Sequence, residues 1–240
     1  MRILIISDIH ANFTALETVL DDAGKVDAVW CLGDVVGYGP DPNECIARLQ
    51  QIPNLVCLQG NHDAAVVGDL PLDGFNYEAR LSVGWQQETV TAASRKFLVS
   101  LEPKTVVNDV TLAHASPRQP IFEYLLDTYS ASENFGFFNT EFCFVGHTHV
   151  PSIFVHDHDG VNLVVPEPNT QVELRGRCIA NPGSVGQPRD RDPRSAYVIF
   201  DDQAGTWDFR RVEYDVASVQ ERMQAAQLPE RHILRLAYGN

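Results

Sequence analysis

The sequence has few positive charges and no long apolar run. Its 240 residues include 18 Lys and Arg against 32 Asp and Glu, which gives a formal net charge of −14. A protein that binds DNA or RNA needs a basic stripe for the phosphate backbone, so this balance argues against a nucleic-acid polymer as partner. No apolar stretch approaches the roughly 18 residues of a membrane span, and the run at residues 3–6 is too short for a signal peptide. We therefore expect a cytoplasmic protein with no membrane partner.

Cysteine usage gives no sign of a disulfide framework. The five cysteines are odd in number, none forms a C-x-x-C pair, and four of them lie in apolar runs. Cysteine in such surroundings behaves as a small hydrophobic residue. The pattern is typical of free, buried thiols in a reducing compartment.

Short apolar runs recur along the chain and predict a buried sheet. Their length and the turn residues around them suit strands that are covered on both faces. The predicted strands are residues 3–6, 28–32, 55–58, 110–113, 142–145, 178–180 and 196–200. Between the first two, a helical pattern follows Asn12 as N-cap and ends at Gly24. A strand, a helix and a strand at this spacing form a βαβ unit, so we predict an α/β fold in a single domain spanning residues 1–240.

Two segments break the alternation of strand and helix. Residues 64–105 contain two helical patterns, at 77–90 and 91–101, and a second helical stretch is expected over residues 121–138 within the segment 118–140. We predict that these two insertions form a small helical cap. Later, Asp159-Gly160 is a strong hairpin turn signal between two apolar runs, and residues 216–226 predict a closing helix.

Polar residues with metal-binding chemistry follow five of the predicted strands. They are Asp8 and His10; Asp34; Asn61 and His62; His114; and His147 and His149. The loops beyond the carboxyl ends of strands in an open α/β sheet converge on one crevice. Residues two apart in an extended segment point to the same side, so Asp8 with His10, and His147 with His149, can act together. The five loops therefore bring carboxylate, amide and imidazole groups to one place.

This mixture of groups indicates a metal centre. Carboxylate oxygens and imidazole nitrogens bind divalent cations such as Zn, Mn, Fe, Co or Ni. There are more candidates than one ion needs, whereas two ions that share a bridging carboxylate would use them well. Two such ions can generate a hydroxide and stabilise both oxygens of an in-line phosphoryl displacement. Because bound cations reverse the local field, a small phosphorylated substrate is compatible with the negative net charge.

The ordered motifs Asp-x-His, Gly-Asp, Gly-Asn-His-Asp, a lone His and Gly-His-Thr-His resemble those of the calcineurin-like metallophosphoesterase superfamily. Three further segments resemble a bacterial subgroup of small phosphoesterases that is related to diadenosine tetraphosphatases. They are residues 33–40, residues 181–189 and the ending near residues 227–230. The resemblance covers essentially the whole chain.

The resemblance implies a four-layer αββα sandwich of two mixed β-sheets flanked by helices. It assigns a first metal to Asp8, His10, Asp34 and His149, and a second to Asp34, Asn61, His114 and His147. Both are divalent, with Mn²⁺ the first choice and Fe, Zn, Ni or Co as alternatives. A metal-bound hydroxide would attack phosphorus, and His62 would protonate the leaving oxygen. An imidazole beside two cations suits that role.

The chain departs from the protein Ser/Thr phosphatases of this superfamily. They carry an Asp and an Arg where this sequence has Gly37 and Tyr38, so protein dephosphorylation is disfavoured. Candidates for substrate contact are Arg118, Arg189 and Asn181, whereas the cluster at residues 156–159 is interpreted as a solvated hairpin tip.

The leading hypothesis is hydrolysis of a small phosphodiester or a nucleotide phosphoanhydride. The alternatives are a general phosphomonoesterase, a nuclease and, in another class, a metal-binding interaction scaffold without activity. Assembly of identical chains stays open.

Overall fold

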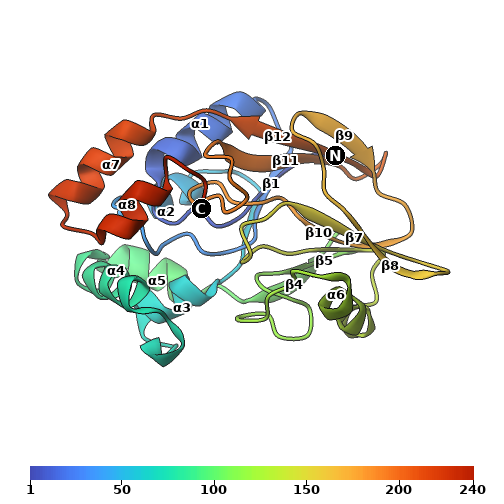
Figure 1. The fold of residues 1–240 in the computed structure, drawn as a ribbon, viewed down its shortest axis with the longest axis horizontal. Helices are drawn as coiled ribbons and strands as arrows, with labels where there is room; N and C mark the ends of the chain where they lie inside the picture. Colours follow the sequence, from blue (N-terminus) through green and yellow to red (C-terminus); the bar gives the residue numbers. More distant parts are fainter.

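Two six-stranded sheets face each other in the computed structural model, which describes residues 1–240 (Figure 1). The first sheet has the order β3 (Leu55–Cys57), β2 (Ala28–Cys31), β1 (Arg2–Ile6), β11 (Ser195–Asp201), β12 (Thr206–Val212) and β9 (Thr170–Glu173). The second has the order β4 (Lys104–Val107), β5 (Val110–Ala113), β6 (Phe142–Phe144), β10 (Arg177–Asn181), β7 (Ser152–Asp157) and β8 (Gly160–Val164). Each sheet has three parallel strands, β1 to β3 and β5, β6 and β10, extended by antiparallel ones. The predicted αββα sandwich of mixed sheets is confirmed.

Alternation along the strands divides the core into layers. Ile3 and Ile5 of β1 belong to the cluster between the sheets, whereas Leu4 and Ile6 belong to the cluster under the outer helices. The second sheet alternates likewise, since Phe144 faces the inner cluster and Cys143 the outer one. Side chains in a strand point to opposite faces in turn, so strands buried on both faces become continuous apolar runs. This is why all seven runs predicted as strands are strands.

Helices cover the outer faces. Helix α1 (Phe13–Ala23) begins where the Asn12 side chain accepts a hydrogen bond from the Ala15 backbone N–H at 3.1 Å, and ends at Gly24 with φ 63°. Helix α2 (Pro42–Gln50) packs beside it, and α7 (Val216–Ala225) and α8 (Glu230–Arg235) close the chain around a small apolar cluster. None of the helices combines the length and the apolar character that a membrane-spanning segment requires. All five cysteines are free, and Cys57 alone is not fully buried.

The first insertion is helical, as expected. It contains α3 (Asn61–Val67), the short 3₁₀ turn η1 (Leu72–Gly74), α4 (Tyr77–Thr89) and α5 (Ala92–Val99). Ala79, Val83 and Leu98 from these helices lie in the same cluster as the outer face of the first sheet. The insertion is therefore part of the packed helical layer, and it also contributes to the wall of the pocket described below.

The second insertion is less helical than the prediction for residues 121–138. Helix α6 spans only Thr128–Asn134 and is followed by the 3₁₀ turn η2 (Phe135–Phe137), so the expected helix over residues 121–127 is wrong. Asp127 accepts a hydrogen bond from the Ser130 backbone N–H at 2.7 Å, which fixes the start of the helix at Thr128. The insertion packs on the outer face of the second sheet through Ala131 and Phe135.

Candidate metal centre

The loops at the carboxyl ends of the strands bring every predicted metal ligand to one place. None is more than 5% exposed. Asp8 and His10 follow β1, Asp34 follows β2, Asn61 begins α3 after β3, and the remaining three follow β5 and β6. The ligand atoms form two groups that share one residue: Asp8, His10, Asp34 and His149, and Asp34, His114 and His147.

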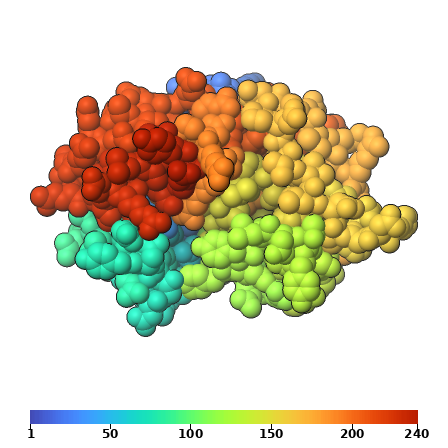
Figure 2. Space-filling model, viewed as in Figure 1, coloured from blue at the N-terminus to red at the C-terminus, as the bar shows by residue number.

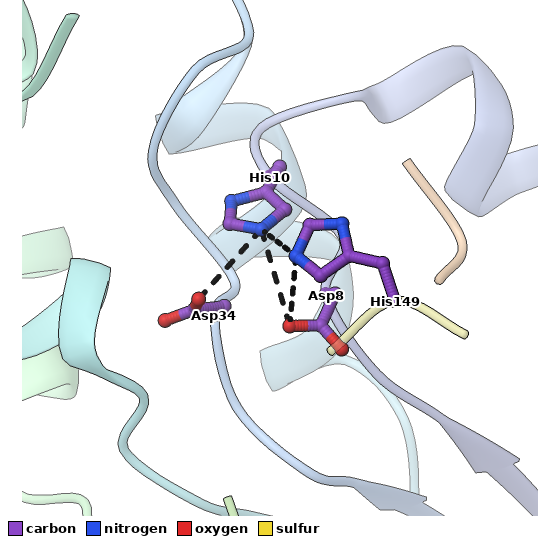
Figure 3. A group of neighbouring side chains, drawn as sticks. All are labelled: Asp8, His10, Asp34 and His149. Atoms are coloured by element: carbon purple, nitrogen blue, oxygen red, sulfur yellow. Dashed lines mark hydrogen bonds and ion pairs between the residues drawn. The ribbon is translucent and has the colours of Figure 1, made fainter. Parts of the chain in front are cut away.

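The first group is close enough to enclose one cation (Figure 3). The Nε2 atoms of His10 and His149 lie 3.0 Å apart. The His149 Nε2 lies 3.4 Å from Asp8 Oδ1, and the His10 Nε2 lies 3.6 Å from Asp34 Oδ2. Figure 3 shows the two rings and two carboxylates turned toward one another.

The tautomers of these rings show that the group fits a cation. The His10 Nδ1 lies 3.0 Å from the Val36 carbonyl oxygen, and the His149 Nδ1 lies 2.5 Å from that of Gln187. A carbonyl oxygen can only accept, so both Nδ1 atoms carry hydrogen and a neutral ring has a bare lone pair at Nε2. Two lone pairs and two carboxylates facing one another repel unless a positive charge lies among them. Backbone carbonyls that fix ring orientation in this way are typical of metal-binding histidines.

The second group has the same design. The His114 Nδ1 lies 2.8 Å from the Leu32 carbonyl oxygen, so its Nε2 faces inward, 3.2 Å from Asn61 Oδ1 and 3.5 Å from Asp34 Oδ2. The His147 Nε2 is buried and has no hydrogen-bond partner. Amide and carboxylate oxygens with imidazole nitrogens again make a donor set for a divalent cation. Asp34 can contribute to both groups.

Burial perturbs the protonation of these residues when no cation is present. It raises the pKa of Asp8 to about 7 and that of Asp34 well above its usual range. Burial also lowers the pKa values of His10, His147 and His149 well below the ordinary value for histidine. Removal from water disfavours the charged form of each group. Deprotonated imidazoles are the form that binds a metal, and a cation would offset the cost of ionising the carboxylates.

Five of the seven predicted ligands have a backbone conformation that is uncommon outside glycine. They are Asp8, His10, Asp34, His147 and His149, with φ between 50° and 66°. Left-handed conformations cost energy in non-glycine residues and concentrate at functional sites. The loops also approach each other closely: a Cβ atom on Gly60 would lie 2.0 Å from Asp34 Oδ1. The backbone is thus fitted to aim these side chains inward.

His62 lies beside the metal ligands without being in either group. Its ring is 4.9 Å from that of His10, 4.4 Å from Tyr38 and 5.0 Å from Phe75, measured between centroids. The His62 Nδ1 is buried without a partner. A Cβ atom on Gly37 would lie 2.4 Å from that nitrogen, so the glycine makes room for the ring.

A pocket of about 110 Å³ opens onto these residues, with room for several water molecules. Asp34, Asn61, His62, His147 and His149 form its metal-binding side. Its other side is formed by Arg189 and by residues of both insertions, including Phe75, Phe122 and Tyr124. Figure 2 shows a notch in the surface between the teal atoms of the first insertion and the yellow-green atoms of the second.

The three predicted substrate residues have different surroundings. Arg189 lines the pocket, where its Nη2 lies 3.3 Å from the Tyr38 hydroxyl. Arg118 does not line it, and its guanidinium is paired with Glu123 and, at 3.5 Å, with Glu133.

Asn181 is buried and its amide is fully engaged. It donates to the Gly146 carbonyl at 2.7 Å and the Thr148 hydroxyl at 3.0 Å, and accepts from the Gly183 N–H. The side chain therefore holds the loop that carries His147 and His149. The acidic and histidine cluster at residues 156–159 is exposed at a hairpin tip and forms no metal-binding group.

Sequence patterns missed the residues that brace the site. Asp63 accepts hydrogen bonds from the backbone N–H groups of Val36 at 3.0 Å and Gly60 at 2.9 Å, joining two ligand-bearing loops. Gln86 of α4 accepts from the Gly37 N–H at 2.6 Å and donates to the Gly39 carbonyl at 2.8 Å. Asp63 lies within the Gly-Asn-His-Asp motif, and this motif is the sequence feature that could have identified it. Nothing in the sequence singles out Gln86, which is 47 residues or more from its partners.

Comparisons with known proteins agree with this site. Residues 1–205 match the calcineurin-like phosphoesterase superfamily domain. An uncharacterized protein of Methanocaldococcus jannaschii is 38% identical over 236 residues, covering 95% of this chain and 94% of its own. The crystal structure of a metallophosphoesterase from Sphaerobacter thermophilus is 46% identical, with a TM-score of 0.92 over 100% of this chain and 99% of its own. A hypothetical protein from Pyrococcus horikoshii OT3 shares the fold, at 20% identity and a TM-score of 0.82 over 100% and 98% of the two chains. This chain belongs to the calcineurin-like phosphoesterase superfamily and is a metal-dependent phosphoesterase.

Proposed function

We propose that the protein hydrolyses a small phosphodiester or a nucleotide phosphoanhydride at a centre of two divalent cations. The observation that carries the proposal is the pair of ligand groups that share Asp34 on one side of the pocket. Asp8, His10, Asp34 and His149 would hold one ion, and Asp34, Asn61, His114 and His147 the other. When bound, two such cations supply an activated water and neutralise the charge that develops on the phosphoryl oxygens. Mn²⁺ is the first candidate, with Fe, Zn, Ni and Co as alternatives.

His62 is the proposed general acid. It lines the pocket beside Asn61 and His147, within reach of a phosphoester held there. Burial and the positive charge of Arg189 lower the pKa of His62 well below its ordinary value. The negative charge of a bound phosphoester opposes both effects and would favour a protonated ring. His62 would then give its proton to the leaving oxygen.

The pocket wall favours substrates with a second substituent on the phosphate. Phe75 and Phe122, one from each insertion, lie with centroids 6.1 Å apart, and the Tyr124 ring is 4.2 Å from that of His147. These aromatic faces offer an apolar surface for an aryl group or a nucleobase. A phosphomonoester with a small alcohol would leave this surface unused, so a diester or a nucleotide is preferred over a general monoester. The expected partner is thus a small phosphorylated molecule.

Chelator-stripped protein would test this proposal with bis(p-nitrophenyl) phosphate and p-nitrophenyl phosphate, with and without Mn²⁺. We expect Mn²⁺-dependent turnover that favours the diester and is lost in His62→Ala and Asp34→Asn. His158→Ala is a matched control, because it removes an exposed imidazole from the hairpin tip. A preference for the monoester would favour the phosphomonoesterase alternative. No turnover by protein that binds metal would favour the scaffold.

A further inference from the structure

Two arginines beside the pocket have no acidic partner. The chain has 32 Asp and Glu residues against 18 Lys and Arg, so acidic side chains are plentiful. Neither Arg189 nor Arg235 has a carboxylate oxygen within 4.0 Å, whereas Arg231, on the same helix as Arg235, pairs with Glu78 at 3.9 Å. A partly buried guanidinium without a counter-ion is costly, so the pair calls for an explanation.

The two guanidinium groups converge on one neutral side chain. The Arg189 Nη2 donates to Gln187 Oε1 at 3.0 Å, and the Arg235 Nη1 donates to the same oxygen at 3.1 Å. One amide oxygen satisfies two of the ten N–H donors that the pair carries. The Nε atoms of both arginines are buried without a partner, as are Gln187 Nε2 and His232 Nδ1. All four of these atoms are nitrogens, and the two arginine Nε atoms carry N–H groups from which an anion can accept hydrogen bonds.

Arg189 connects the pair to the metal-binding side of the pocket. Arg189 lines the pocket together with His149 and Tyr38. Arg235 stands on α8, where it contacts Gln187 and lines a separate hollow with Tyr238. Burial and the neighbouring Arg189 charge lower the pKa of Arg235 to about 10, so the Arg235 guanidinium stays charged at neutral pH. Arg189 in the pocket wall and Arg235 on α8 are therefore joined through the Gln187 oxygen.

We propose that Arg189 and Arg235 form a subsite for a second phosphate, the one linked to the phosphate that is hydrolysed. Planar guanidinium forks match the geometry of phosphate oxygens and bind them with charge-assisted hydrogen bonds. The substrate class is then a linked di- or polyphosphate, such as a nucleoside diphosphate derivative. Water adds its oxygen to one phosphorus and loses a proton to solvent, and the bond from that phosphorus to the bridging oxygen breaks. The released phosphate takes a proton from His62, which solvent then replaces. This inference rests on the proposed function, which it narrows from phosphoesters in general to phosphoanhydrides.

The test compares two inhibitors of bis(p-nitrophenyl) phosphate hydrolysis in Mn²⁺-loaded protein: α,β-methylene-ADP, which carries two linked phosphorus groups, and AMP, which carries one. We expect the wild-type protein to bind α,β-methylene-ADP at least tenfold more tightly than AMP. This affinity ratio corresponds to a difference in binding free energy of about 1.4 kcal/mol. Arg235→Gln should reduce this ratio to near one. Arg231→Gln is the matched control on the same helix and should keep the wild-type ratio, because Arg231 is exposed and already paired.

Two results would overturn the subsite: a wild-type ratio near one, or an Arg235→Gln variant that keeps the wild-type ratio. If Arg235→Gln does not fold, Arg235→Lys replaces it, because lysine keeps the positive charge and lacks the planar guanidinium fork. The affinity ratio of this variant should be at least about threefold lower than that of the wild-type protein. If the wild-type protein hydrolyses neither the diester nor ADP, the proposed function fails. The same ratio is then measured by calorimetric titration, so the subsite is judged separately from catalysis.

Discussion

Removal of the metals should destabilise the whole protein. Without cations, the Nε2 lone pairs of His10 and His149 face each other at 3.0 Å, and five ligand residues keep left-handed backbone conformations. A ligand that binds only the folded state stabilises it by about 2.7 kcal/mol at a free concentration of 100 times its Kd. Two sites at that saturation would contribute about 5 kcal/mol. For a chain of this length, about 1 kcal/mol shifts Tm by roughly 2–4 °C, so the expected difference is about 10–20 °C.

The assay is thermal unfolding of chelator-stripped protein, with and without Mn²⁺, followed by circular dichroism. Asp34→Asn should lose most of the shift, because Asp34 serves both groups. His62→Ala should keep the shift and lose turnover, because His62 is in neither group. His158→Ala should resemble the wild-type protein. Equal Tm values for stripped and Mn²⁺-treated wild-type protein would refute the reasoning, as would an Asp34→Asn variant with the full shift.

Three further substitutions test the pocket and its support. In Gly37→Ala, a Cβ atom 2.4 Å from His62 Nδ1 should displace the proposed acid and lower kcat at least tenfold, while the Mn²⁺-dependent Tm shift remains. An unchanged kcat would argue against His62 as the general acid. Phe122→Ala should raise KM for the aryl diester by about two- to tenfold through loss of an aromatic contact, whereas Tyr129→Ala, 77% exposed on the same insertion, should not. Gln86→Ala leaves two buried backbone groups unpartnered at about 1–3 kcal/mol each, so urea unfolding should report a loss of roughly 2–6 kcal/mol.

The layers of the fold could be predicted because a strand that is buried on both faces has an unbroken apolar sequence. The short strands at or near the sheet edges, β4 and β9, were missed for the opposite reason. Residues 104–107 and 170–173 are mostly half-buried or exposed, and they mix polar with apolar residues. The boundary of α6 was also missed, because it depends on the side chain of Asp127 rather than on apolar periodicity.

The candidate ligands could be found from sequence because each follows a strand, and parallel strands end at one edge of a sheet. Their supports could not be found in this way. The carbonyl groups that orient His10 and His149 belong to Val36 and Gln187, 26 and 38 residues away in the chain. Any residue type supplies a carbonyl group, so such a partner leaves no trace in the sequence.

The arrangement of charge reconciles an acidic protein with an anionic substrate. The formal net charge of −14 would repel a phosphate at long range, but solvent-exposed charges are largely screened beyond about 8 Å at physiological ionic strength. In the proposed site the local charge balance reverses, because two divalent cations together with Arg189 and Arg235 would outweigh Asp8 and Asp34. The same acidic surface would repel a long polyanion, which has many charges outside the pocket. Global and local charge together therefore support the proposal of a small phosphorylated substrate that can place all its phosphates within the site.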